Sequence, residues 1–310
     1  MHELCDLVKA DRACARIVMV LTGAQISRAI ELTPGIDFVP FSELQPPAWI
    51  KELHEEASWP LSPTFERVAP SSALVMQHPL SPIFTTEDQI EHSFPLSQIA
   101  QLRKMAYCIA LTAERSPAIL TVWCEDDDPR LPILSSGVGY GDPRWGRGTA
   151  TPYNVDPEQV HSLYASYIKF RGDLHPIDTA MSRLAEAWGG WSREERAIDL
   201  GIGLEVVLTH TRGKDSNQNT EIRYRLGVHA GWLLGGNAAE RKSICQKIRR
   251  LYDLRSQAAH FGTVKGKLDT WTAIDDEIEA DIALGSRIVT AILSQGEWPD
   301  WNDLVFGETP

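Results

Sequence analysis

Arg255 and His260, in the stretch LYDLRSQAAHFG at 251–262, are residue types that together can do chemistry on RNA. Histidine titrates near neutral pH and can move protons to or from a ribose 2′-hydroxyl and a leaving 5′ oxygen. Arginine can hold a phosphate through two hydrogen bonds and stabilise its developing charge. Because RNA supplies the nucleophilic 2′-hydroxyl, such a pair needs no metal. The ordinary alternative is an arginine in a core ion pair and a histidine at a helix C-terminus.

Position tells more about this pair than spacing, because Arg223 and His229 have nearly the same spacing. Arg255 continues an apolar stripe of the helix that we expect between Asn237 and Gly262, a stripe formed by Ile244, Ile248, Leu251 and Tyr252. A guanidinium on a core-facing stripe must be paired, or must face an interface or an anionic ligand. His260 lies about 140° further around an ideal helix. The two side chains therefore meet only if the helix end unwinds, or across a dimer two-fold.

Glu205 lies within GIGLEVVL, a segment that is apolar on nearly every side. An ionised carboxylate there is costly unless it is paired, and we expect Arg255 or Arg225 as its partner. The pair is either purely structural or orients the guanidinium of Arg255. Gly201 and Gly203 each lower the helix propensity by about 1 kcal/mol relative to alanine. Because glycine has no side chain, the two residues indicate that another helix approaches closely there. His229 shares a stripe with Ile222, Leu226 and Leu233 and is interpreted as a core or interface histidine, on a different face from Arg223.

The net charge of −12 argues against a protein that coats nucleic acid nonspecifically, so a nucleic-acid site must be a local basic patch. One such patch lies between Asn237 and His260, a segment that contains six basic residues and only two acidic ones. Lys247, Arg249 and Arg250 are its candidate RNA-binding residues. We expect no metal and no cofactor: no P-loop follows the Gly-rich stretch 135–154, and no paired-Asp metal motif follows a Gly-Ser turn.

The composition predicts a folded cytoplasmic protein with a well-buried core. Its 310 residues are enough for two domains, 43% of them are hydrophobic, and no stretch is apolar enough to span a membrane. The five scattered cysteines read as reduced thiols, and the N-terminus has no secretory signal.

Two kinds of patterning divide the chain, with a Gly-rich linker or long loop at the junction. Residues 1–150 carry four apolar runs of strand length, at 15–22, 36–41, 73–77 and 118–125. Between the last two, apolar residues recur at helical spacing over 97–116. This pattern predicts an α+β domain of unknown role. The pattern of residues 151–310 predicts an antiparallel helical bundle, with helices over about 157–171, 176–188, 219–234 and 271–295, one through RAIDLGIGLEVVLTH after Ser192, and one between Asn237 and Gly262. Helix starts are marked by Asp156-Pro157 and by capping boxes at Ser192 and Asn237.

Three segments in order, AIDLGIGLEVVL, EIRYRLGVHAGWLLG and ERKSICQKIRRLYDLRSQAAHFG, resemble the Apea-like branch of the HEPN superfamily. The resemblance covers essentially the second half of the chain. It implies a helical bundle that dimerises, and metal-independent endoribonuclease activity in antiphage defence or a toxin-type system. It places Arg255 and His260 in the catalytic slot of arginine, four intervening residues and histidine. Ser256 stands where asparagine, aspartate or histidine is commoner, and it is a supporting residue together with Glu205.

We therefore expect an endoribonuclease that cleaves RNA through Arg255 and His260 at a homodimer interface. The N-terminal half either senses a trigger, in which case a regulatory protein is a possible partner, or holds the nuclease inactive. The alternative hypothesis is a non-catalytic HEPN scaffold or RNA-binding module within a larger defence complex. Ser256 and the acidic net charge favour that alternative.

Overall fold

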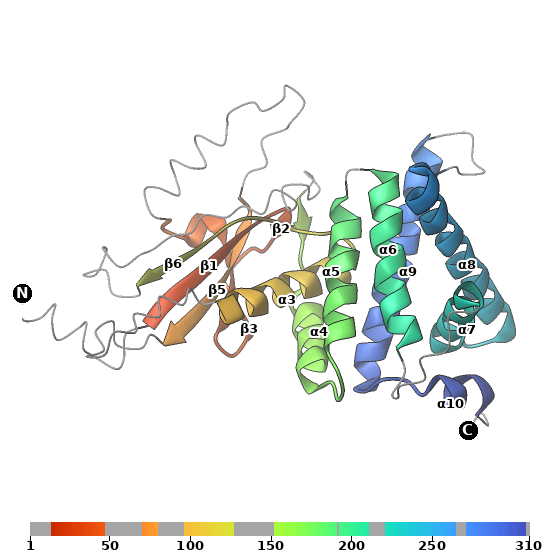
Figure 1. The fold of residues 1–310 in the computed structure, drawn as a ribbon. Helices are drawn as coiled ribbons and strands as arrows, with labels where there is room; N and C mark the ends of the chain where they lie inside the picture. Colours follow the sequence, from red (N-terminus) through yellow and green to blue (C-terminus); the bar gives the residue numbers. More distant parts are fainter. Residues whose placement is uncertain are drawn as a thin grey trace, which may run out of the picture. The chain divides into compact units, whose positions relative to one another are not determined.

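The chain divides into two compact units, the first comprising Met1–Ala106 and Pro117–Glu158, the second Tyr107–Ser116 and Gln159–Pro310 (Figure 1). The computed structural model describes residues 14–46, 70–79, 96–126, 152–190, 192–210, 221–264 and 271–307. Most of the Gly-rich stretch 135–154 lies outside them. The first unit contains a small antiparallel sheet and the second is mostly helical, as the sequence predicts.

The sheet of the first unit has five strands in the order β3-β4-β5-β1-β6, and each neighbouring pair is antiparallel. The strands are β1 (Cys14–Thr22), β3 (Ile30–Thr33), β4 (Ile36–Pro40), β5 (Ser72–Pro79) and β6 (Ala118–Asp126). Residues 17–21 of β1 are fully buried, because this strand lies between β5 and β6 and is covered on both faces. A strand in that position needs a continuous apolar run rather than alternation, and the sequence IVMVL provides it.

The four predicted strands and the predicted helix, α3 (Leu96–Ala113), are confirmed. The sequence reading missed β3, which forms a hairpin with β4 around Gly35, a residue with φ of +79°. It also missed a short parallel pair, β2 (Ala24–Gln25) with β7 (Tyr153–Asn154), and the 3-10 turn η1 (Phe41–Glu43). These elements are too short for periodicity to reveal them.

The second unit is built from α4 (Pro157–Lys169), α5 (His175–Gly189), α6 (Arg193–Thr209), α7 (Ile222–Leu234), α8 (Ala238–Phe261), α9 (Trp271–Gln295) and α10 (Trp301–Phe306). The predicted caps are confirmed. The Ser192 hydroxyl accepts from the Glu195 amide at 3.1 Å, and the Asn237 side chain accepts from the Glu240 amide at 3.0 Å. Gly262 ends α8 with φ of +62°, in the left-handed region that favours glycine.

Helix α6 is the centre of this unit, because it packs against α5, α7, α8 and α9 (Figure 1). Two of its glycines permit this, as predicted. A Cβ at Gly203 would lie 3.3 Å from Cβ of Arg183 on α5. A Cβ at Gly201 would lie only 2.4 Å from Cγ of Arg255 on α8. The sequence pattern GIG therefore sets the approach of both neighbouring helices.

No helix in the described part of the chain combines the length and the apolar character that a membrane span requires.

Candidate active site

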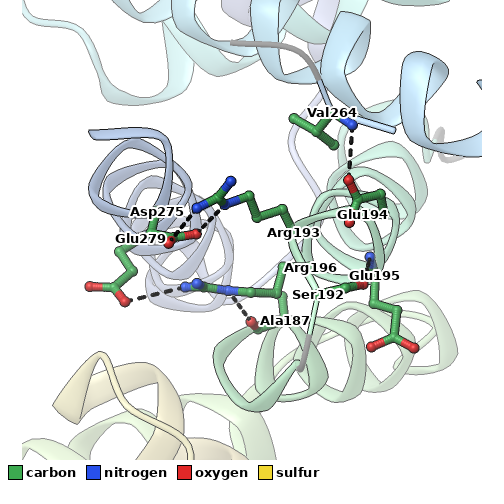
Figure 2. A network of polar contacts seen from close by, with 9 residues as sticks. All are labelled: Ala187, Ser192, Arg193, Glu194, Glu195, Arg196, Val264, Asp275 and Glu279. Carbon is green, nitrogen blue, oxygen red and sulfur yellow. Dashed lines mark hydrogen bonds and ion pairs between the residues drawn. The ribbon is translucent and has the colours of Figure 1, made fainter. Parts of the chain in front are cut away.

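The C-terminal end of α8, which carries both predicted catalytic residues, is fixed to the start of α6. Beyond the Gly262 cap, the Val264 amide donates to Oε1 of Glu194 at 3.0 Å (Figure 2). The same turn of α6 carries Arg193, which donates to both carboxylate oxygens of Asp275 on α9, at 2.6 and 2.8 Å. Three helices are thus joined at this end of the bundle, where the chain leaves α8 beyond His260.

Arg196 completes this polar network on the side of α5 (Figure 2). Its Nε donates to the carbonyl oxygen of Ala187 at 3.1 Å, and its Nη2 lies 3.5 Å from Glu279 of α9. Hydrogen bonding to Arg193 holds the pKa of Asp275 below its usual range. The ion pair therefore persists at mildly acidic pH.

Arg255 lies at the α6–α8 contact, and its stem packs directly on the backbone of Gly201. Its Nη2 is 3.3 Å from Oε2 of Glu205, one turn further along α6, and its guanidinium carbon lies 5.6 Å from the centre of the Tyr252 ring. The buried stripe of α8 continues through Leu254 and Ala258, while the Arg255 side chain remains 28% exposed. The guanidinium is therefore paired and directed by α6, yet still accessible to a ligand.

Glu205 has Arg255 as its partner, which confirms one of the two pairings expected from the sequence. The contact is within ion-pair distance, but Oε2 of Glu205 is buried and receives no hydrogen bond of good geometry. Pairing with a cation offsets the cost of burying a carboxylate, but an incomplete hydrogen-bond set leaves part of that cost. The Glu205 side chain as a whole is 29% exposed, so the carboxylate orients the guanidinium without locking it in place.

His260 is exposed in the last turn of α8, next to Phe261, which is 76% exposed. Their rings meet edge to face with centroids 6.4 Å apart. The helix remains regular through Phe261, so its end does not unwind to bring His260 to Arg255. Within one copy the two side chains leave the helix about 140° apart. Arg255 and His260 of one copy therefore do not face one another.

The three predicted RNA-binding residues do not share one surface. Arg250 forms an ion pair with Glu277 of α9, and Lys247 and Arg250 both act on the carboxyl group of Asp281. Burial raises the pKa of Asp281 to about 6, against the opposing effect of these two cations. Arg249 instead lies over the ring of Tyr224 on α7, with its guanidinium carbon 4.6 Å from the ring centre. Only Arg249 of this trio is directed toward α7.

Arg223 and His229, the second arginine–histidine pair of the sequence, do not come together. Arg223 pairs with Asp253 at 2.5 Å and donates to the carbonyl oxygen of Arg249. His229 is buried, as predicted; its Nδ1 donates to the carbonyl oxygen of Leu208 at 2.7 Å, and its ring stacks on Trp301. Burial lowers the pKa of His229, which keeps it neutral in the core.

Comparisons with protein-family models, with curated proteins and with solved structures found no match to this chain. Within the described ranges, no group of three or more His, Cys, Asp and Glu side chains is placed to hold a metal ion.

Proposed function

We propose that the second unit is a metal-independent endoribonuclease domain of the HEPN type, in which Arg255 and His260 cleave RNA. The observation that carries the proposal is the state of Arg255: a part-exposed guanidinium, set by Gly201 and Glu205, on the helix whose capped end presents an exposed histidine. With 28% of its side chain in solvent, the guanidinium of Arg255 can still meet an anionic ligand. Together with the resemblance in the sequence, this geometry favours phosphate binding.

In the proposed reaction His260 accepts the proton of the ribose 2′-hydroxyl, and the resulting oxygen attacks the adjacent phosphorus. Arg255 holds the non-bridging oxygens and stabilises the charge of the transition state. The P–O5′ bond breaks, and the leaving oxygen takes a proton from water. The products are a 2′,3′-cyclic phosphate and a 5′-hydroxyl end. Ser256, one residue after Arg255, is a candidate donor to the same phosphate.

We propose that the active form is a homodimer through the C-terminal end of α8. In one copy Arg255 and His260 diverge, so one active site needs an arginine from one protomer and a histidine from the other. Phe261 supports this assembly: it is 76% exposed beside His260, and large exposed aromatic side chains are typical anchors of protein interfaces. A second copy would cover it and exclude water from the paired site.

The biological setting that we propose, cytoplasmic antiphage defence or a toxin-type system with the first unit as sensor or inhibitor, follows from the resemblance alone. The competing proposal is a non-catalytic HEPN scaffold. The ion pair of Arg255 with Glu205 favours it, because a paired guanidinium can also be purely structural.

Purified protein incubated with total RNA in EDTA tests the proposal against the scaffold alternative. We expect fragments ending in 2′,3′-cyclic phosphate from the wild type, and none from Arg255→Ala or His260→Ala proteins that still dimerise. If wild type and variants are equally silent, with and without a lysate from phage-infected cells, the nuclease proposal is wrong and the scaffold proposal stands.

A further inference from the structure

The face of α8 that carries His260 continues away from the helix end as a polar stripe. Arg249, Asp253, Ser256 and His260 follow each other at intervals of four, three and four residues. On an α-helix these intervals return to nearly the same side, so that Arg249 and His260 differ by only about 20° around the axis and about 16 Å along it. We call Arg249, Asp253, Ser256 and His260 the His260 stripe. Arg255 lies off it, on the side facing α6.

Helix α7 supplies an aromatic ring and a second arginine to the far end of the His260 stripe. Tyr224 is 54% exposed, although it belongs to the large aromatic residues that proteins commonly bury. The guanidinium of Arg249 covers one part of its ring, and Arg223 reaches Asp253 and the carbonyl oxygen of Arg249. The close approach of α7 and α8 depends on a glycine, because a Cβ at Gly227 would lie 2.9 Å from Sγ of Cys245.

We propose that the His260 stripe with Tyr224 and Arg223 is a binding track for single-stranded RNA, and that one base stacks on Tyr224. This inference rests on the proposed function and names the form of its substrate. An exposed tyrosine flanked by two arginines combines the two features by which proteins hold single strands, a stacking surface for a base and cations for the backbone. A base can reach such a ring only when it is unstacked from a duplex, which favours single strands over double-stranded RNA.

The charges along the track fit a polyanion. Arg223 and Asp253 form an exposed pair, with 53% and 43% of their side chains accessible. Such pairs contribute little stability, so a phosphate can displace Asp253 from Arg223. The opposite face of α8 does not offer cations to a phosphate in the same way. There Arg250 is paired with Glu277, and Arg250 and Lys247 both act on Asp281. Of the basic residues predicted to bind RNA, we therefore assign Arg249 to the track and exclude Lys247 and Arg250.

The track is tested by binding of a fluorescein-labelled 2′-O-methyl oligoadenylate to the full-length protein. This RNA lacks the nucleophilic 2′-hydroxyl and cannot be cleaved, so binding is measured independently of catalysis. Loss of one base–aromatic stack is expected to weaken binding by about 5- to 150-fold in Tyr224→Ala, while Tyr224→Phe binds like the wild type. Arg249→Ala is expected to reduce the slope of log K against log salt by about 0.7.

Asp253→Asn is expected to tighten binding, because it removes the negative charge from the track and releases Arg223. A purely structural role of Asp253 would not produce this gain. Two matched controls are expected to bind like the wild type: Lys247→Ala, which removes a charge from the opposite face of α8, and Phe306→Ala, which removes an aromatic side chain that is 83% exposed on α10.

The proposal is overturned if Tyr224→Ala binds like the wild type, or if the equivalent duplex binds as tightly with the same dependence on Tyr224. It is also overturned if Tyr224→Ala alters only the oligomeric mass, since the surface would then be a contact between copies. The nuclease activity and the RNA-binding track can be rejected independently of each other. Cleavage that requires Arg255 but binding that ignores Tyr224 rejects the track alone, whereas Tyr224-dependent binding without cleavage rejects the nuclease and keeps the track.

Discussion

Replacing Gly201 by alanine is expected to displace Arg255 without unfolding the bundle. The added Cβ would lie 2.4 Å from Cγ and 2.8 Å from Cβ of Arg255. An ordinary contact between carbon atoms is about 3.5–4.0 Å, so the arginine stem or the α8 backbone must move by about 1 Å or more. These are stem atoms rather than the far end of a flexible side chain, so a change at the tip cannot relieve the clash.

The expected effect is large on cleavage and small on stability. A displacement of about 1 Å in a catalytic group costs about 100-fold in rate. Overpacking destabilises by about 1–3 kcal/mol, and the gain in helix propensity from glycine to alanine returns about 1 kcal/mol, leaving a net loss of about 0–2 kcal/mol. Initial rates on a fluorophore–quencher RNA in EDTA, with urea unfolding of the same preparations, measure the two effects separately.

Gly203→Ala is the matched control, two residues away on the same helix. Its added Cβ would lie 3.3 Å from Cβ of Arg183 and 3.4 Å from the carbonyl oxygen of Ala180, both on α5. It gains the same helix propensity but leaves Arg255 in place, so cleavage should stay close to the wild-type rate. Wild-type cleavage by Gly201→Ala, or an equal loss of activity in Gly203→Ala, would show that the contact between Gly201 and Arg255 does not position the arginine for cleavage.

Three further perturbations follow from the same contacts. Glu205→Gln keeps the shape of the side chain but removes the charge that holds Arg255, so cleavage should fall by roughly tenfold or more, measured at saturating RNA. Phe261→Ser removes an exposed aromatic side chain from the proposed interface and should shift the protein toward monomer in analytical ultracentrifugation, with a parallel loss of cleavage. Asp281→Asn should stabilise the protein at pH 8 by up to about 3 kcal/mol and leave it unchanged near pH 4, as measured by urea unfolding.

The sign of the Asp281 effect follows from burial, which raises its pKa from 3.8 to about 6. Between about pH 4 and pH 6 the folded state holds a proton that the unfolded state has released, so stability falls as the pH rises through this window. Asparagine cannot ionise and escapes this loss. A variant that is no more stable than the wild type at pH 8 would contradict the burial argument. An unchanged dimer in Phe261→Ser, or full activity in Glu205→Gln, would contradict the other two expectations.

The features that the sequence predicts correctly depend on residues close together in the chain. The caps at Ser192, Asn237 and Gly262 are hydrogen bonds or backbone conformations within a single turn, so residue types at fixed offsets predict them. The Glu205–Arg255 pair was expected for another reason: a carboxylate in an apolar helix needs a cation, and Arg255 was one of the two candidates, beside Arg225.

The features that it missed depend on which helix packs beside which. Lys247, Arg249 and Arg250 look equivalent in the sequence, but α9 presents Glu277 and Asp281 to one side of α8 while α7 presents Tyr224 to the other. No local pattern contains that information. The exposure of Tyr224 could not be predicted either, because periodicity identifies an apolar face but not the part of it that a neighbouring helix leaves uncovered.

The central claim, a composite site with Arg255 from one copy and His260 from another, is tested most directly by mixing two inactive variants. Arg255→Ala and His260→Ala proteins are mixed in equal amounts, allowed to exchange subunits, and assayed for RNA cleavage in EDTA. Half of the dimers should then be mixed, each with one intact site, so cleavage should return to about one quarter of the wild-type rate. If the mixture exchanges subunits and remains silent while the wild type is active, the two residues do not act across a two-fold.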